Sequence, residues 1–281
     1  MIFILEKKLS NGVNMPQVGL GVYKMTDEAE AIEAITTALD VGYRAIDTAT
    51  LYANEKEVGK AIQASSVPRE DIFITTKVWN TDHGYDETLR AFEKSLELLE
   101  LDYLDSYLVH WPVPEKFTDT YKAIERLYEE KLIRVPGVSN HHEEHLKKLE
   151  NTANIKPVIN QIECHPRLQQ DALINFCKER DIAVTAWGPL GRGRLLPDDH
   201  LAQLAKKYNK TAAQLILRWH LERDTIIIPK SVTPSRIKEN FDVFDFELTK
   251  DDMKEIANYE SNGRTGANSS EPDFMKHFEG M

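Results

Sequence analysis

Short runs of apolar residues alternate along this chain with segments whose apolar residues recur every three or four positions. The first kind of run predicts buried β-strands, and the second predicts amphipathic helices. We expect strands at residues 18–22, 45–47, 72–78, 103–110, 134–138, 158–162, 182–187 and 225–228. A helix capped by Thr26 should come next to the first strand, with others near residues 55–64, 89–99, 119–131, 143–150, 171–180, 199–208 and 211–221, and two more beginning at Thr233 and Thr249.

Eight strand-then-helix units without a linker predict a single domain over residues 1–281, an α/β fold of the (β/α)8 TIM-barrel type. Residues 2–9 and 12–15 should form a hairpin ahead of the barrel, and residues 260–281 an irregular tail. The alternative is an open doubly wound sheet, which usually carries G-x-G-x-x-G after its first strand. Here Gly19 and Gly21 are followed by Val22, Tyr23 and Lys24, so that motif is absent.

Composition and charge limit the kinds of binding partner that this chain can have. With 41% hydrophobic and 29% charged residues, the chain has the composition of a soluble globular protein with a large core. A net charge of -11 argues against nucleic acid as the main partner. No apolar run is long enough for a membrane span, and residues 1–9 lack the apolar stretch of a signal peptide. Cys164 and Cys177 are expected to be buried thiols, which favours a cytoplasmic protein; we also expect a monomer.

Candidate chemistry gathers where the predicted strands end. Asp47, Lys77 and His110 each lie at the carboxyl end of a strand, and Tyr52 lies in the loop after Asp47. In a parallel barrel these ends meet at one mouth, which carries the active site. Taken singly, each has an ordinary explanation, such as a helix cap, a surface cation or a core histidine. Their convergence at one mouth favours a common site.

These four side chains suit the protonation of a carbonyl group. A tyrosine has a reference pKa of about 10, and a neighbouring ammonium should lower that pKa by stabilising the phenolate. Asp47 can hold Lys77 in place beside Tyr52, while His110 orients a carbonyl oxygen. The expected unit would protonate a C=O group while another molecule delivers hydride.

Over nearly its whole length the chain resembles the aldo-keto reductases. The matching blocks are RAIDTA at residues 44–49 with Tyr52, TTKVWN at 75–80, LVHWP at 108–112, GVSN at 137–140, NQIE at 160–163 and IPKS at 228–231. The resemblance implies a tetrad of Asp47, Tyr52, Lys77 and His110, with Tyr52 as general acid. It also implies reduction of aldehydes or ketones with NADPH, which becomes NADP+. We expect small polar carbonyls, such as keto-sugars or glyoxals, as substrates.

The resemblance also assigns residues to the cofactor. Ser139, Asn140 and Gln161 should hold the nicotinamide carboxamide, Trp187 should stack on the nicotinamide ring, and Gly188 and Leu190 should line the pyrophosphate path. The chain between the seventh strand and its helix is short, so no long belt should cover the cofactor.

A phosphate site is expected from the residues after the last strand. Lys230 and Ser231 precede a helix opened by Thr233 and Pro234, and Arg236 lies in its first turn. Free N–H groups at a helix start favour an anion, and barrels often bind phosphate at this place. The cluster predicts a preference for NADPH over NADH. The resemblance adds Asn240 at the adenine, with Glu239 beside it. The alternative is a solvated helix start with Arg236 paired to Glu239 or Asp242.

Some features depart from the family or allow a second explanation. Most of the family has Tyr at Trp187; this Trp and His141 resemble the bacterial diketogluconate-reductase branch, and Pro136 interrupts the usual motif in the fifth strand. The run HHEEH at residues 141–145 resembles a zinc motif, but its spacing does not fit H-E-x-x-H, and we expect no metal. Three aromatic residues follow predicted strands and could be ordinary core residues. We prefer to assign them to the lining of the substrate pocket: Tyr23, Trp79 and Trp111.

Two rival functions remain for such a barrel. A nicotinamide-binding sensor or partner protein could use the same scaffold without turnover, although the intact tetrad weighs against it. A metal-dependent hydrolase would need His and acidic ligands at several strand ends, and here only one strand end carries a histidine.

Overall fold

The computed structural model describes residues 5–279, and its centre is an eight-stranded parallel sheet. Each strand pairs with the next one along the chain, so chain order and sheet order agree. The strands are β3 (Leu20–Gly21), β4 (Ala45–Asp47), β5 (Phe73–Val78), β6 (Leu104–Val109), β7 (Ile133–Ser139), β8 (Ile159–Glu163), β9 (Ala183–Trp187) and β10 (Ile226–Ile227). All eight predicted strands are therefore confirmed, with ends shifted by a few residues.

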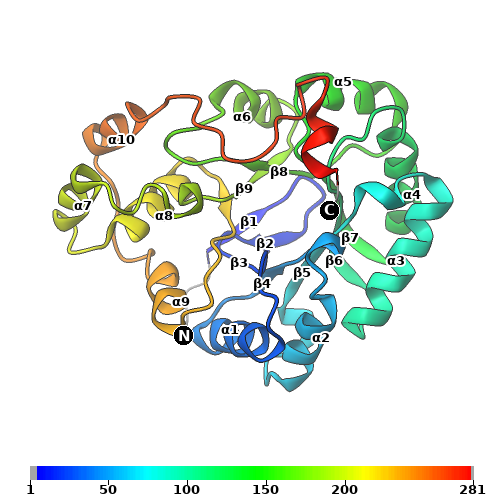
Figure 1. Ribbon diagram of the computed structural model, residues 1–281, viewed down its shortest axis with the longest axis horizontal. Coiled ribbons are helices and arrows are strands. Elements are labelled where there is room, and N and C mark those ends of the chain that lie inside the picture. The colour runs from blue at the N-terminus through cyan, green and yellow to red at the C-terminus, as the bar shows by residue number, and fades with distance from the viewer. Residues whose placement is uncertain (1–4, 280–281) are drawn as a thin grey trace.

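The sheet closes on itself between its first and last strands. Val18 forms a parallel bridge with Ile227, and the Gly19 amide donates to the Ile227 carbonyl at 2.8 Å. The Ile227 amide in turn donates to the Gln17 carbonyl at 2.9 Å. A side chain at Gly21 would bring its Cβ within 2.9 Å of the Ile228 carbonyl oxygen, so only glycine fits this seam. The predicted barrel is thus confirmed, and its strands surround a common axis (Figure 1).

Helices cover the outside of the barrel (Figure 1). They are α1 (Glu28–Val41), α2 (Glu55–Ala64), α3 (Tyr85–Leu99), α4 (Phe117–Glu129), α5 (Glu143–Thr152), α6 (Asp171–Lys178), α7 (Asp199–Lys206), α8 (Ala212–Glu222), α9 (Pro234–Phe241) and α10 (Lys250–Ala257). The predicted cap of α1 was wrong by one residue. Asp27, not Thr26, is the N-cap, because its carboxylate accepts the Glu30 amide.

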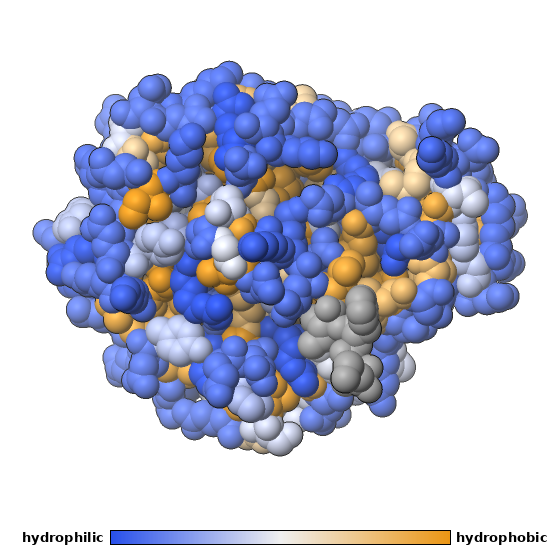
Figure 2. Space-filling model, turned by 180° about the vertical axis from the view of Figure 1, so that it is seen from behind, coloured by the Kyte–Doolittle hydropathy of each residue, from blue (hydrophilic) through white to orange (hydrophobic). Residues whose placement is uncertain are grey.

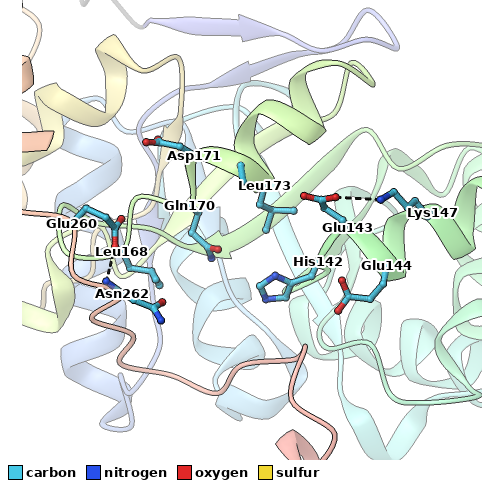
Figure 3. Close-up of a pocket in the computed structure, with 11 residues that line it drawn as sticks. His142, Glu143, Glu144, Lys147, Leu168, Gln170, Asp171, Leu173, Glu260 and Asn262 are labelled. Atoms are coloured by element: carbon cyan, nitrogen blue, oxygen red, sulfur yellow. Dashed lines mark hydrogen bonds and ion pairs between the residues drawn. The ribbon is translucent and has the colours of Figure 1, made fainter.

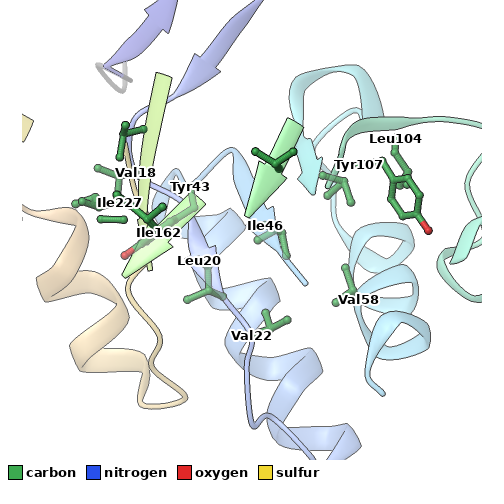
Figure 4. Packing of buried hydrophobic residues seen from close by; sticks show 14 of the residues in the cluster. Val18, Leu20, Val22, Tyr43, Ile46, Val58, Leu104, Tyr107, Ile162 and Ile227 are labelled. Atoms are coloured by element: carbon green, nitrogen blue, oxygen red, sulfur yellow. The ribbon is translucent and has the colours of Figure 1, made fainter. Parts of the chain in front are cut away.

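The main core lies between the strands and the helices. Apolar side chains from strands and from the helices behind them meet there, and Val18, Leu20, Ile46 and Tyr107 are among the labelled members in Figure 4. Fully burying a side chain of this size contributes about 1.5–3 kcal/mol. This packing holds the strands beside one another, so that their carboxyl ends together form one rim.

The N-terminal hairpin closes the opposite end of the barrel. Strands β1 (Glu6–Lys8) and β2 (Asn14–Pro16) pair antiparallel, as predicted, while residues 2–4 of the expected first strand lie outside the described range. Leu9 and Met15 join a second buried cluster with Phe73, Leu108 and Ile159. This end is therefore filled by side chains.

The outer surface is mostly polar. Figure 2 shows the face opposite to that in Figure 1, where apolar atoms appear in separate patches between hydrophilic side chains. None of the helices within residues 5–279 is both long enough and apolar enough to span a bilayer.

The C-terminal tail runs from α10 past α6 and α5 to the mouth of the barrel (Figure 1). It is irregular, as predicted, except for a short 3-10 turn at Phe274–Phe278. Pro136, which departs from the usual family motif, does not disturb β7, since Ser139 still pairs with Gln161 of β8. The strand ends that carry the site are therefore in regular register.

Candidate active site

A cavity of about 810 Å³ opens at the carboxyl ends of the strands. Its lining includes all of the predicted cofactor residues: Ser139, Asn140, Gln161, Trp187, Gly188, Leu190, Lys230, Ser231, Arg236, Glu239 and Asn240. Asp47, Tyr52 and His110 line it too, together with Tyr23 and Trp111. Lys77 and Trp79 do not line the cavity; Lys77 contacts Tyr52, and Trp79 packs edge-on against His110.

Lys77 is fully buried and lies next to three groups at the mouth of the barrel. Its Nζ lies 2.5 Å from Oδ1 of Asp47, donates to the Thr48 carbonyl at 2.8 Å and lies 3.5 Å from the Tyr52 hydroxyl. Burial lowers the pKa of Lys77 and raises that of Asp47, while their mutual attraction opposes both changes. The structure thus brings together the acid, ammonium and phenol that the sequence had separated.

Burial, not the ammonium, dominates the titration of Tyr52. It raises the pKa of Tyr52 well above 10, and the negative charge of Asp47 raises it further. The sequence-based expectation of a lowered pKa was therefore wrong, because Asp47 offsets the charge of Lys77 and the site excludes water. The phenol stays protonated near neutral pH and can donate a proton.

Asn54, which no sequence pattern predicted as a site residue, holds the loop of Tyr52. Asn54 is buried; its Oδ1 accepts the Thr48 hydroxyl at 2.7 Å, and its Nδ2 donates to the carbonyls of Val22 and Met25. The loop after β4 is thereby tied to the loop after β3. No periodic pattern marks Asn54, although Asn is typical of such loop-to-backbone contacts.

His110 lies beside the phenol and carries no charge near neutral pH. Its ring centre is 5.9 Å from that of Tyr52 and 5.1 Å from that of Trp79. Burial and the nearby charge of Lys77 hold the pKa of His110 well below 6.5. A neutral imidazole keeps one N–H, which can donate to a carbonyl oxygen in the cavity.

A string of polar contacts follows the ends of β7, β8 and β9. The Ser139 hydroxyl donates to the Gln161 carbonyl at 2.8 Å, and Asn140 Nδ2 donates to the Ser139 hydroxyl and to the His110 carbonyl. Trp187 Nε1 donates to Asn140 Oδ1 at 2.8 Å. Gln161 Nε2 donates to Asp47 Oδ2 at 2.6 Å. Ser139, Asn140, Gln161 and Trp187 are therefore connected by hydrogen bonds to Asp47 and to the backbone of His110.

The start of α9 forms the other end of the cavity. Lys230 and Arg236 are exposed, and neither makes an ion pair within residues 5–279. The alternative pairing of Arg236 is not found: Glu239 accepts the Thr211 hydroxyl, and Asp242 pairs with Lys210. Two cations beside a helix start without a side-chain cap fit a phosphate group.

The tail forms one wall of the cavity, along a path that no sequence pattern predicted. Phe278 packs against Trp111 and Trp79, with ring centres 4.9 Å and 5.3 Å apart. His277 and Phe278 line the cavity, as do Gly266 and Ala267. Buried Glu163 holds this segment by accepting the backbone N–H groups of Thr265 and Gly266. These contacts join residues far apart in sequence.

The histidine-rich run at residues 141–145 starts a helix. The His142 amide donates to Nδ1 of His145, which completes the cap of α5. Figure 3 shows His142, Glu143 and Glu144 spread around a surface pocket, with Glu143 paired to Lys147. Within the described part of the chain, no group of three or more His, Cys, Asp or Glu side chains could hold a metal ion.

Comparison with known proteins places this geometry in a family. Residues 15–260 match the model of the aldo/keto reductase family. A glyoxal reductase of Bacillus subtilis is 52% identical over 94% of this chain and 96% of its own length. A 9,11-endoperoxide prostaglandin H2 reductase of Trypanosoma cruzi is 50% identical over 92% of both chains. A methylglyoxal reductase of Salmonella typhimurium is 48% identical, covering 92% of this chain and 94% of its own.

Solved structures agree in fold and cofactor. A point mutant of Gox0644, solved in complex with NADPH, has a TM-score of 0.91 and 42% identity, covering 96% of this chain and 98% of its own. An aldo-keto reductase of Bombyx mori, solved with NADP, has a TM-score of 0.89 and 34% identity over 98% of both chains. The chain belongs to the aldo/keto reductase family and is an NADP-dependent oxidoreductase that acts on carbonyl groups.

Proposed function

We propose that this enzyme reduces small polar carbonyl compounds, with glyoxal and methylglyoxal as representative substrates, and that Tyr52 donates the proton. The observation that carries the proposal is the position of Lys77, whose Nζ contacts Asp47 and lies 3.5 Å from the Tyr52 hydroxyl. The names of two relatives support the substrate class, since they reduce glyoxal and methylglyoxal. A third relative of similar identity is named for a prostaglandin, so identity alone does not decide the substrate.

Residues of this chain hold the proton and transfer it to the substrate. Tyr52 enters the reaction as a neutral phenol, because burial keeps its pKa high. When it donates its proton to the substrate oxygen, the resulting phenolate lies next to the Lys77 ammonium. Asp47 holds that ammonium in place through its 2.5 Å contact. Neutral His110 donates its N–H to the same substrate oxygen and so orients the carbonyl.

The cavity suits NADPH, which supplies the hydride when bound. An ionised Asp47 can only accept hydrogen bonds, so Gln161 must present its NH2 to it, and Oε1 remains for the carboxamide N–H. We assign the nicotinamide end to Ser139, Asn140 and Gln161, with Trp187 against the ring. The remaining assignments follow the lining of the cavity: Gly188 and Leu190 for the pyrophosphate, Lys230, Ser231 and Arg236 for the 2′-phosphate, and Glu239 and Asn240 for the adenosine.

Aromatic side chains favour small substrates. The ring of Tyr23 is 5.0 Å from that of Tyr52, and Trp111 lines the cavity beside Phe278. Trp79 acts indirectly, through its edge-on contact with His110. A compact carbonyl compound reaches Tyr52 between these rings, whereas a bulky one must displace the tail.

The test measures NADPH oxidation with glyoxal, methylglyoxal and a bulky aromatic ketone, in the wild type and in Tyr52→Phe. The variant should lose turnover by roughly 10²–10⁴-fold while binding NADP+ as the wild type does. Tyr85→Phe, at an exposed position, is the matched control and should leave turnover unchanged. Wild-type turnover in Tyr52→Phe would refute the assignment, and turnover of the bulky ketone alone would refute the substrate class.

Three broader expectations belong to the same proposal. We propose a single domain over residues 1–281, a monomer in solution and a cytoplasmic location. The two cysteines, Cys164 and Cys177, are buried and unpaired, which is consistent with a reducing compartment. Analytical ultracentrifugation tests the monomer, and one cooperative unfolding transition tests the single domain.

A further inference from the structure

Gln161 and Asp47 meet across the inside of the barrel. Gln161 belongs to β8 and Asp47 to β4, and three other strands separate them in the sheet. Gln161 Nε2 nevertheless donates to Asp47 Oδ2 at 2.6 Å, and the two residues are only 2% and 4% exposed. A contact between buried polar groups from opposite walls requires that both strand ends be placed accurately.

The two oxygens of Asp47 serve different partners. Oδ1 receives the Lys77 ammonium, and Oδ2 receives the Gln161 amide. A carboxylate that accepts a donor on each oxygen has its plane fixed, since rotation would break both bonds. Gln161 therefore helps to set where Lys77 points and, through Lys77, the environment of the Tyr52 hydroxyl.

The other end of the Gln161 amide faces a ligand site. Because Nε2 is directed at a carboxylate, Oε1 is oriented away from it. Oε1 makes no hydrogen bond to any residue between 5 and 279, and Gln161 lines the cavity. An acceptor in this position fits the N–H of a primary carboxamide.

We propose that Gln161 is a positioning residue that links the nicotinamide subsite to the proton donor: Oε1 accepts the carboxamide N–H, and Nε2 orients Asp47. This inference rests on the proposed function for the roles of Lys77 and Tyr52. The Gln161 side chain then binds the cofactor and also holds in place the Asp47–Lys77 ion pair beside Tyr52. An amide bonded at both ends is more rigid than one bonded at one end, so cofactor binding should also stiffen the Asp47–Lys77 pair.

The first experiment uses NADP+ binding alone, followed by quenching of tryptophan fluorescence. Gln161→Met keeps the length of the side chain and removes both polar atoms, and it should weaken NADP+ by roughly 3- to 10-fold. Asp47→Asn removes the charge that orients the amide, so Gln161→Met should cost less in that background. Losses that simply multiply in the double variant would refute the link.

The second experiment measures kcat for a small aldehyde at saturating NADPH across pH. Gln161→Met should lower kcat by on the order of 10-fold and alter its pH profile, because Asp47 Oδ2 loses its donor. Gln63→Met makes the same change at an exposed position of α2, and it should alter neither kcat nor its dependence on pH. Weaker cofactor binding with a wild-type kcat and pH profile would show that Gln161 is a cofactor ligand only.

Two controls keep the result interpretable. Circular dichroism melts identify a variant that fails to fold, and Gln161→Asn then serves as the second variant, since its shorter amide cannot span both partners. If the wild type reduces no carbonyl compound, the proposed function fails. NADP+ binding by the two single variants and the double variant still tests the link between Gln161 and Asp47.

Discussion

The indole of Trp187 donates its Nε1–H to Oδ1 of Asn140 over 2.8 Å. Asn140 uses both hydrogens of its amide on the His110 carbonyl and the Ser139 hydroxyl. Trp187 thus fixes the orientation of an amide that is itself bonded to the backbone of His110. A tyrosine, which the resemblance to the family led us to expect here, has no donor at the position of the indole nitrogen. The difference therefore adds a contact to the network and does more than enlarge an aromatic surface.

Replacing Trp187 with Phe separates stacking from hydrogen bonding. Trp187→Phe keeps an aromatic face but leaves Asn140 Oδ1 without its donor, so NADP+ should bind roughly 3- to 10-fold more weakly. Trp187→Ala also loses the ring and should cost more, since aromatic contacts contribute about 0.5–1.5 kcal/mol beyond burial. Calorimetric titration with NADP+ measures both. Equal affinities in Trp187→Phe and the wild type would show that the hydrogen bond is unimportant.

Removing the Lys77 charge should affect both turnover and stability. Lys77→Met leaves Asp47 buried without its cation, which costs about 3–5 kcal/mol of unfolding free energy. Turnover should fall by roughly 10²–10⁴-fold, because the phenolate of Tyr52 loses its stabilising charge.

The partner variant gives the matching comparison. Asp47→Asn should reduce turnover less, and the double variant should be no slower than Lys77→Met and more stable than it, because no unpaired charge remains. Chemical denaturation and steady-state rates measure these effects. If the effects of the two single variants on unfolding free energy and on turnover are additive in the double variant, then Asp47, Lys77 and Tyr52 do not act as a unit.

The pH dependence of reduction should be flat across the neutral range. Tyr52 must be protonated to donate, and its raised pKa means that this form is lost only as pH rises well above 10. His110 must be neutral, and its lowered pKa means that the neutral form is lost only as pH falls well below 6.5. We expect kcat at saturating NADPH to vary less than about twofold from about pH 6 to about pH 9. A fall near pH 8 would indicate a phenol with a lowered pKa.

The alternation of apolar runs and helical patterns was sufficient to predict the barrel, and parallel strands then required Asp47, Lys77 and His110 to share a mouth. The pKa of Tyr52 was predicted in the wrong direction, because burial depends on how the loops close over it. The tail was unpredictable for a related reason. Its path depends on the buried carboxylate of Glu163, which holds Thr265 and Gly266, and no periodic pattern encodes such a contact.

Phe278 offers a test of the tail as a substrate wall. Phe278→Ala removes the ring that packs against Trp111 and Trp79, so the KM for small carbonyls should rise by roughly 3- to 10-fold. Activity with bulky aldehydes should rise relative to glyoxal, while NADP+ affinity stays unchanged. Lys276→Ala alters the same turn at an exposed position and serves as the control. An unchanged ratio of bulky to small substrates would remove the tail from specificity.

The preference for NADPH should depend on Arg236. The guanidinium lies in the first turn of α9, is exposed and forms no ion pair with any residue from 5 to 279, so it is available to a phosphate. Pro234 occupies the first helical position, which leaves the later backbone N–H groups free, and Lys230 adds a second cation to the cavity. A charge-assisted hydrogen bond contributes about 1.5–3 kcal/mol, and each 1.4 kcal/mol is about tenfold in affinity.

Arg236→Met should therefore weaken NADPH binding by roughly 10- to 100-fold and leave NADH within a few-fold of the wild type, because only NADPH carries the 2′-phosphate. Lys238→Met, in the same helix but outside the cavity lining, is the matched control and should change neither. The measurement is a pair of dissociation constants in each protein at one fixed ionic strength, since exposed charges are screened by salt. If the affinities for NADPH and NADH fall equally, Arg236 contacts a part that both cofactors share, and the 2′-phosphate is recognised elsewhere.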